Sequence, residues 1–151
     1  MKLVSLLLGG ASPRVHLHLR VMDALRRRGM KRLGRLVAAR LQRKHGVFVS
    51  SKAVVPASVE LKHPVGIVIG DGVRLGERVV IYQNVTLGGA RVGDWTSDNY
   101  PEVGDDSVIF AGAVVVGKIK IGKGCVIGAN AVVTRDVPDG ATAVGVPARI
   151  I

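Results

Sequence analysis

The sequence predicts an all-β solenoid, a parallel β-helix of hexapeptide repeats preceded by a short N-terminal helical segment. Three observations lead to this fold class. An aliphatic residue recurs at every sixth position in two long runs, the position four residues further on is nearly always small or aliphatic, and aromatic residues make up only 3% of the chain. A period of six suits neither an amphipathic helix nor an alternating strand, but it suits a coil in which each repeat forms one short strand and a turn. A core of stacked aliphatic side chains needs few aromatic rings.

The repeat positions define the extent of the solenoid. The two runs consist of Ile69, Leu75, Ile81 and Leu87, and of Val103, Ile109, Val115, Ile121, Ile127 and Val133. The same spacing continues towards the N-terminus through Val49, Val55, Leu61 and Ile67. We therefore assign residues 47–151 to the β-helix and residues 1–46 to a basic helical segment. The single cysteine, Cys125, falls at an inward small position and is expected to be buried.

The basic segment is predicted to form two short helices. Ser12 and Pro13 are typical of a helix start, as N-cap and first helical residue, and Gly29 can end that helix. A second helix is predicted from about Lys31 to Lys44. Its inward-facing residues are expected to be Leu33, Leu36, Val37 and Leu41.

The net charge of the chain belongs to the basic segment. Residues 1–46 hold 12 Lys and Arg residues and one acidic residue, Asp23, whereas residues 47–151 hold 10 of each kind. Three explanations stay open: a solvated face, contact of residues 14–44 with an anionic membrane, or binding of an acidic polymer. Nucleic acid is not expected as a partner, because no aromatic residues interleave with the basic ones.

The N-terminal sequence does not predict a membrane span. The apolar stretch from Leu3 to Leu8 is much shorter than the ~20 residues that a spanning helix needs. No convincing small-residue cleavage site follows it, so a signal peptide is not expected either. We therefore expect a cytoplasmic protein, with a peripheral position at the inner face of the membrane as the alternative that the basic segment allows.

Two breaks interrupt the repeat. The phase shifts by two positions between Ile67 and Ile69, just after His63, which predicts a bulge in one coil. The spacing from Leu87 to Val103 is not a multiple of six, so residues 88–102 are predicted to leave the coil as an extended loop. Long loops in compact repeats are often functional, although a tolerated insertion is the simpler alternative.

His63 is the only histidine within the repeat. A neutral imidazole can take a proton from a hydroxyl near pH 7, and the position beside the bulge supports such a role. From the spacing alone, the alternative of an ordinary surface histidine stays open. His16 and His18 face different sides of their predicted helix. No metal site is therefore expected.

Five segments carry a resemblance to a known family. They are His63–Asp71, Gln83–Gly89, Ala111–Ala113, Ile127–Val133 and Ala143–Ile150. In these segments the chain resembles the catalytic domain of the serine acetyltransferases and their relatives in the hexapeptide-repeat acyltransferase superfamily. The resemblance implies a left-handed parallel β-helix, a homotrimer, and acetyl-CoA in the groove between neighbouring coils. It also implies that His63 is the general base of a direct acetyl transfer and that the backbone at Gly89, Ala111 and Ala129 contacts the pantetheine arm.

The chain departs from that family around the acceptor. Serine acetyltransferases have an Asp that orients the catalytic histidine and a second acid directly before it, and the corresponding positions here hold Phe48 and Lys62. Because Lys62 would repel the ammonium group of serine, the sequence favours a sugar or glycan hydroxyl as acceptor, in polysaccharide biosynthesis. Trp95 and Tyr100 of the loop are further candidates for acceptor contact. The alternatives are a serine O-acetyltransferase of cysteine biosynthesis and a non-catalytic trimeric β-helix scaffold.

Overall fold

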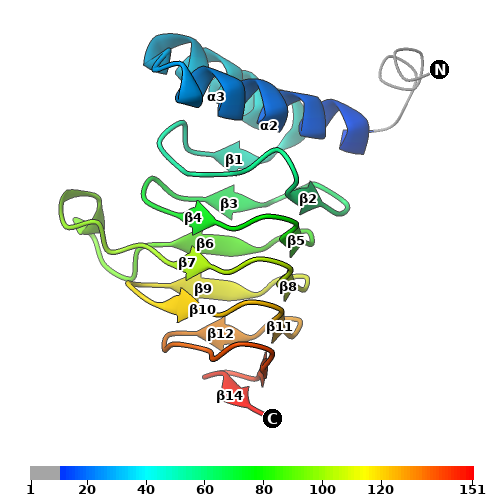
Figure 1. The fold of residues 1–151 in the computed structure, drawn as a ribbon, viewed down its shortest axis with the longest axis vertical. Coiled ribbons are helices and arrows are strands. Elements are labelled where there is room, and N and C mark those ends of the chain that lie inside the picture. Colours follow the sequence, from blue (N-terminus) through cyan, green and yellow to red (C-terminus); the bar gives the residue numbers. More distant parts are fainter. Residues whose placement is uncertain (1–10) are drawn as a thin grey trace.

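The computed structural model describes residues 11–151; residues 1–10 lie outside the described part. Two helices, α2 (Ala11–Arg27) and α3 (Lys31–His45), cover one end of a stack of short strands (Figure 1). Gly46 ends α3 in the left-handed conformation, with φ of 64°, and its N–H donates to the carbonyl oxygen of Gln42. Both predicted helices are thus present with nearly the predicted bounds. None of the helices in the described part is long and apolar enough to cross a membrane.

The strands are two or three residues long. In chain order they are β1 (Phe48–Val49), β2 (Glu60–Leu61), β3 (Val68–Ile69), β4 (Arg74–Leu75), β5 (Val80–Ile81), β6 (Thr86–Gly88), β7 (Glu102–Val103), β8 (Val108–Ile109), β9 (Val114–Val116), β10 (Lys120–Ile121), β11 (Val126–Ile127), β12 (Val132–Val133), β13 (Thr142–Val144) and β14 (Arg149–Ile150). They form three sheets, in the orders β1-β3-β6-β9-β12, β10-β7-β4 and β14-β13-β11-β8-β5-β2. Every pairing is parallel except that of β13 with β14. From β3 to β12, successive strands visit the three sheets in turn, as a three-sided β-helix requires.

The inward positions of the repeat form the core, as the sequence predicts. Leu61, Ile81, Ile109 and Ile127 follow one another in register on successive coils, and all four are 0% exposed. Cys125 is equally buried, at the small inward position. The aliphatic stack explains how such short strands hold together, because each coil buries its side chains against the coils on either side.

The strand register locates both breaks in the repeat. Glu102 pairs with Lys120, so a regular coil spans three hexapeptides. Val68 and Thr86 pair with the same regular offset, whereas the offset between Glu60 and Val80 is longer by two positions. The two extra residues therefore lie in the turn between β2 and β3, which holds His63. The loop between β6 and β7 lengthens its coil far more, as the pairing of Arg74 with Glu102 shows.

The helices, which form the cap of the β-helix, contact the first coils through one face only. Val15 and Leu19 of α2 and Leu41 of α3 are buried in the core. The prediction that Leu33 and Leu36 face inward is wrong, because they are 44% and 65% exposed. Their helix instead approaches the first coil at Gly34, where an added Cβ would lie 3.8 Å from the Cβ of Ser51.

Candidate active site

The turns between the sheets stack into edges that run along the β-helix. The first, named the His63 edge, consists of the turns that follow β2, β5, β8 and β11: residues 62–67, 82–85, 110–113 and 128–131. The second, named the loop edge, consists of the turns that follow β3, β6, β9 and β12: residues 70–73, 89–101, 117–119 and 134–136. In Figure 1 the long loop projects on one side of the stack, and β2, β5, β8 and β11 lie on the other. The predicted site residues divide between these two edges.

His63 is exposed and stands in the turn that the two extra residues enlarge. Its φ of 49° places it in the left-handed region, which is uncommon for residues other than Gly, although Asn, Asp and His adopt it more often than the rest. The ring centroid of His63 lies 6.3 Å from that of Tyr82, which stacks on Phe110 at 5.0 Å. An exposed imidazole beside two aromatic rings is accessible to a substrate hydroxyl and can exchange its proton with it.

Lys62 forms an ion pair with Glu60. The Nζ of Lys62 lies 2.5 Å from Oε2 of Glu60, and the two side chains are 46% and 52% exposed. This hydrogen bond lowers the pKa of Glu60 and raises the pKa of Lys62. Glu60 of β2 and Lys62, the residue after β2, both project outward, on either side of the buried Leu61. The cation that the sequence places beside His63 is thus accompanied by a carboxylate, a partner that the sequence reasoning missed.

Ala111 and Ala129 also lie on the His63 edge. With Gln83 they occupy the same place on three successive coils, two positions after Ile81, Ile109 and Ile127. The Oε1 atom of Gln83 is buried and has no hydrogen-bond partner among the described residues. On the two following coils the small side chain of Ala111 is half-buried and that of Ala129 is exposed at this place.

Gly89 begins the long loop at the other edge, and Asp94 holds that loop in shape. Asp94 is buried, and its carboxylate accepts hydrogen bonds from Nδ2 of Asn99 at 3.1 Å and from the N–H of Arg91 at 2.7 Å. These bonds lower the pKa of Asp94. A Cβ at Gly89 would lie 2.7 Å from the Cβ of Asp94, so only glycine fits there. Trp95 is 62% exposed and stands free of the core.

Tyr100 closes the loop against the coil. A Cβ at Gly72 would lie 2.4 Å from Cδ2 of the Tyr100 ring, so the ring packs directly on that glycine. Burial, and next the charge of Asp71, raise the pKa of the Tyr100 hydroxyl. Within one chain, Tyr100, Trp95 and Gly89 are therefore assembled on the loop edge, away from the edge that carries His63.

Comparison with known proteins agrees with this architecture. The family model described as bacterial transferase hexapeptide (six repeats) matches residues 100–135. The serine acetyltransferase of Mycobacterium tuberculosis is 43% identical over 132 residues, which are 87% of this chain and 57% of that protein. That of Bacillus subtilis is 36% identical over 132 residues, 87% of this chain and 60% of the relative. The chain thus spans less than two thirds of the length of these relatives.

Solved structures give the same result over nearly the whole chain. A serine acetyltransferase in complex with CoA superposes with a TM-score of 0.84 and 33% identity, covering 97% of this chain and 60% of that one. Soybean serine acetyltransferase complexed with serine superposes with a TM-score of 0.86 and 35% identity, and the match again covers 97% of this chain and 60% of that one. The three-sided stack of coils and its match to these structures identify the fold as a left-handed β-helix of hexapeptide repeats. The chain belongs to the hexapeptide-repeat transferase superfamily, in its serine-acetyltransferase-like branch.

The expectation of a sugar acceptor in polysaccharide biosynthesis is wrong. The relatives and structures above are serine acetyltransferases, at 33–43% identity. The expectation rested on Lys62 as a lone cation that would repel the ammonium group of serine. Because Glu60 pairs with Lys62, the two side chains together carry no net charge, and the argument from repulsion fails.

Proposed function

We propose that the protein is an acetyl-CoA-dependent serine O-acetyltransferase. The observation that carries this proposal is the match to serine acetyltransferases over 87% of the chain in sequence and 97% in structure. The accessible imidazole of His63 and the small residues of the His63 edge support it. An activity of this kind makes the protein an acyltransferase with CoA as its released product.

In this mechanism His63 acts as the general base. Its imidazole takes the proton of the serine hydroxyl while the oxygen attacks the thioester carbonyl, and backbone N–H groups stabilise the oxyanion that develops. When the C–S bond breaks, the imidazolium returns the proton to the departing sulfur. Ala111 and Ala129 leave room for the pantetheine arm, and Gly89 does so from the loop edge.

Glu60 and Lys62 provide the complementary charges that a zwitterionic acceptor needs. A free amino acid carries an ammonium and a carboxylate, and the pair next to His63 offers a carboxylate and an ammonium in return. In this proposal Glu60 receives the amino group of serine and Lys62 its carboxylate. Lys62→Gln is expected to raise the KM for serine about tenfold with little change in the KM for acetyl-CoA.

A matched control is Lys123→Gln, because Lys123 forms a comparable ion pair with Asp105, at 3.1 Å, away from the His63 edge. This variant should keep the parent kinetics. If both substitutions change the KM for serine equally, or if Lys62→Gln does not change it, Lys62 does not belong to the acceptor site. Neither result would contradict the proposed activity.

The division of the site between two edges supports a homotrimer. Three copies arranged around a common axis would place the His63 edge of one copy against the loop edge of the next. The expected mass in solution is three times the 15.9 kDa of the chain. Co-expression of His63→Asn with Gly89→Val should restore part of the activity that each variant lacks alone, because mixed trimers contain intact composite sites. Mixed trimers no more active than their parents would contradict a shared site.

The experiment that tests the function follows free thiol release from acetyl-CoA with L-serine as acceptor. Saturable, serine-dependent release is expected, and His63→Asn should lower kcat by about 10²–10⁴-fold. Asn tolerates the left-handed backbone at this position, so the fold should survive, which circular dichroism checks. Release that does not depend on serine, or full turnover without His63, would contradict the proposal, and failure to bind CoA at all would favour a scaffold role.

A further inference from the structure

The outer face of α2 carries apolar side chains that the β-helix does not cover. Leu17 and Val21 are 42% and 38% exposed. They lie four positions apart, on the side of the helix opposite Val15 and Leu19, which are buried in the core. Arg28 continues the same stripe and is exposed at its end. The helix thus has two apolar faces, of which the β-helix covers one.

The turn and α3 carry further exposed apolar side chains. Met30, Leu33 and Leu36 are 42%, 44% and 65% exposed. Arg40 lies four positions after Leu36 on the same helix face and is exposed too. We name these five apolar residues the cap surface: Leu17, Val21, Met30, Leu33 and Leu36. It is located at the end of the molecule farthest from the C-terminal coil (Figure 1).

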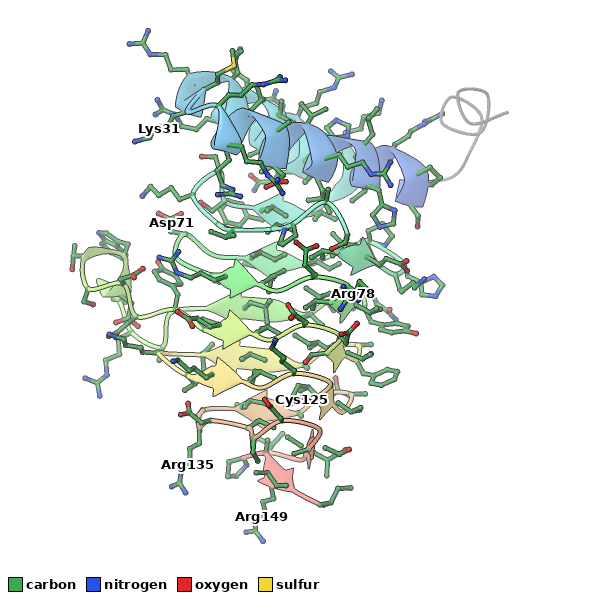
Figure 2. The ribbon with its side chains drawn as sticks, viewed as in Figure 1. Lys31, Asp71, Arg78, Cys125, Arg135 and Arg149 are labelled. Carbon is green, nitrogen blue, oxygen red and sulfur yellow. The ribbon has the colours of Figure 1, made fainter. Side chains whose placement is uncertain are left out.

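The helical segment that carries the cap surface has many more cations than acids. Residues 11–46 contain 11 Lys and Arg residues and a single acid, Asp23. Asp23 is 5% exposed and already binds Arg26 and Arg27, at 2.8 Å each. Figure 2 shows side chains with nitrogen tips, Lys31 among them, projecting from the helices on the outside of the molecule.

We propose that the cap surface docks on an anionic lipid bilayer. Exposed aliphatic side chains framed by Lys and Arg are the composition of an interfacial helix, which buries its apolar residues at the level of the headgroups. The positive charge opposes a cap-to-cap contact with a second copy, since residues 11–46 of neither copy offer a free acid. Single-stranded nucleic acid is disfavoured because the sequence of residues 11–46 holds no Phe, Tyr or Trp on which bases could stack.

The test is co-sedimentation of the full chain with vesicles of phosphatidylcholine containing 30% phosphatidylglycerol, against vesicles of phosphatidylcholine alone. We expect binding to the anionic vesicles at low salt and about tenfold less at 0.5 M NaCl, because the Debye length shortens severalfold. The double variant Leu33→Ser/Leu36→Ser should bind about tenfold more weakly. Circular dichroism shows whether its helices persist.

Two controls separate the cap surface from other causes. Val146→Ser/Ile151→Ser removes apolar residues that are 72% and 81% exposed at the opposite end and should bind like the parent. Leu6→Ser/Leu7→Ser should also keep most of the binding. The proposal is overturned if the parent does not bind anionic vesicles, or if the Val146/Ile151 variant loses binding as much as the Leu33/Leu36 variant. It is also overturned if only the Leu6/Leu7 variant loses binding, or if the protein captures an acidic protein or RNA in preference to vesicles.

Discussion

The coils and the cap bury apolar residues under different constraints. In a coil, backbone N–H groups bond to the next coil, as Val108 does to Cys125 and Val126 to Ala141. Each side chain therefore has a fixed face and a fixed neighbour above and below. The helices of the cap satisfy their backbone internally, so only the face that rests on the first coil is constrained. A solenoid coil is specified on every side, whereas a capping helix is free to carry other chemistry on its outer face.

The largest effect is expected from an inward residue in the middle of the stack. Ile109→Ala removes a side chain that is 0% exposed between two neighbouring coils and should lower the free energy of unfolding by about 2–5 kcal/mol. Leu36→Ala removes a similar volume from the cap, where the side chain is 65% exposed, and should change stability by less than about 0.5 kcal/mol. Urea denaturation followed by circular dichroism measures both. Equal losses would mean that an unseen contact covers the cap in solution.

Replacing a glycine by alanine is expected to change the stability in opposite directions in the coils and in the cap. A Cβ at Gly104 would lie 2.6 Å from the carbonyl carbon of Gly122 on the next coil, so Gly104→Ala forces two backbones apart and should cost about 1–3 kcal/mol. Gly34 lies within α3, and its Cβ would meet only Ser51, at an ordinary 3.8 Å. Gly34→Ala should therefore stabilise the protein by about 0.5–1 kcal/mol, because alanine favours the helix. Thermal unfolding of the Gly104→Ala and Gly34→Ala variants shows whether each substitution lowers or raises the stability. Destabilisation by Gly34→Ala would show that the cap is as tightly packed as a coil.

The same contrast explains what the sequence could predict. Inward residues of the coils follow from counting in sixes, and the enlarged turn at His63 and the loop after Leu87 appear as errors in that count. Counting fails for the cap, because a helical stripe marks Leu33 and Leu36 as apolar without saying what covers them. Whether a side chain such as Leu36 is buried depends on which element packs against it, and this is decided by the tertiary structure.

Prediction of the candidate site was limited in a different way. His63 stood out because it lies beside a break in the period. The partner of Lys62 was missed because the residue was considered alone, although strand alternation places Glu60 on the same face two positions earlier. The separation of Tyr100 from His63 follows only once a coil is known to span three hexapeptides and to turn after each one.

An effect smaller than those of the coil substitutions is expected at the joint between the two regions. His16 of α2 accepts a hydrogen bond through Nε2 from the N–H of Leu61, at 3.0 Å, next to Lys62 and His63. Burial lowers the pKa of His16, and the nearby charges of Arg20 and Lys62 act in the same direction against that of Glu60. Protonation removes the acceptor, so the bond contributes fully above the unfolded pKa of 6.5 and is lost as the pH falls through the lower folded value.

We therefore expect acidification below pH 6.5 to weaken the joint by about 1 kcal/mol, the net worth of one such hydrogen bond. Hydrogen exchange at the amide of Leu61 measures this opening, and exchange at Ile109, inside the stack, serves as the internal reference. His16→Gln provides an acceptor that does not titrate, so it should remove most of the pH dependence without exposing the coil. If Leu61 stays protected in the parent well below pH 6, the joint does not depend on this imidazole. The packing of Val15 and Leu19 would then hold α2 on the first coil by itself.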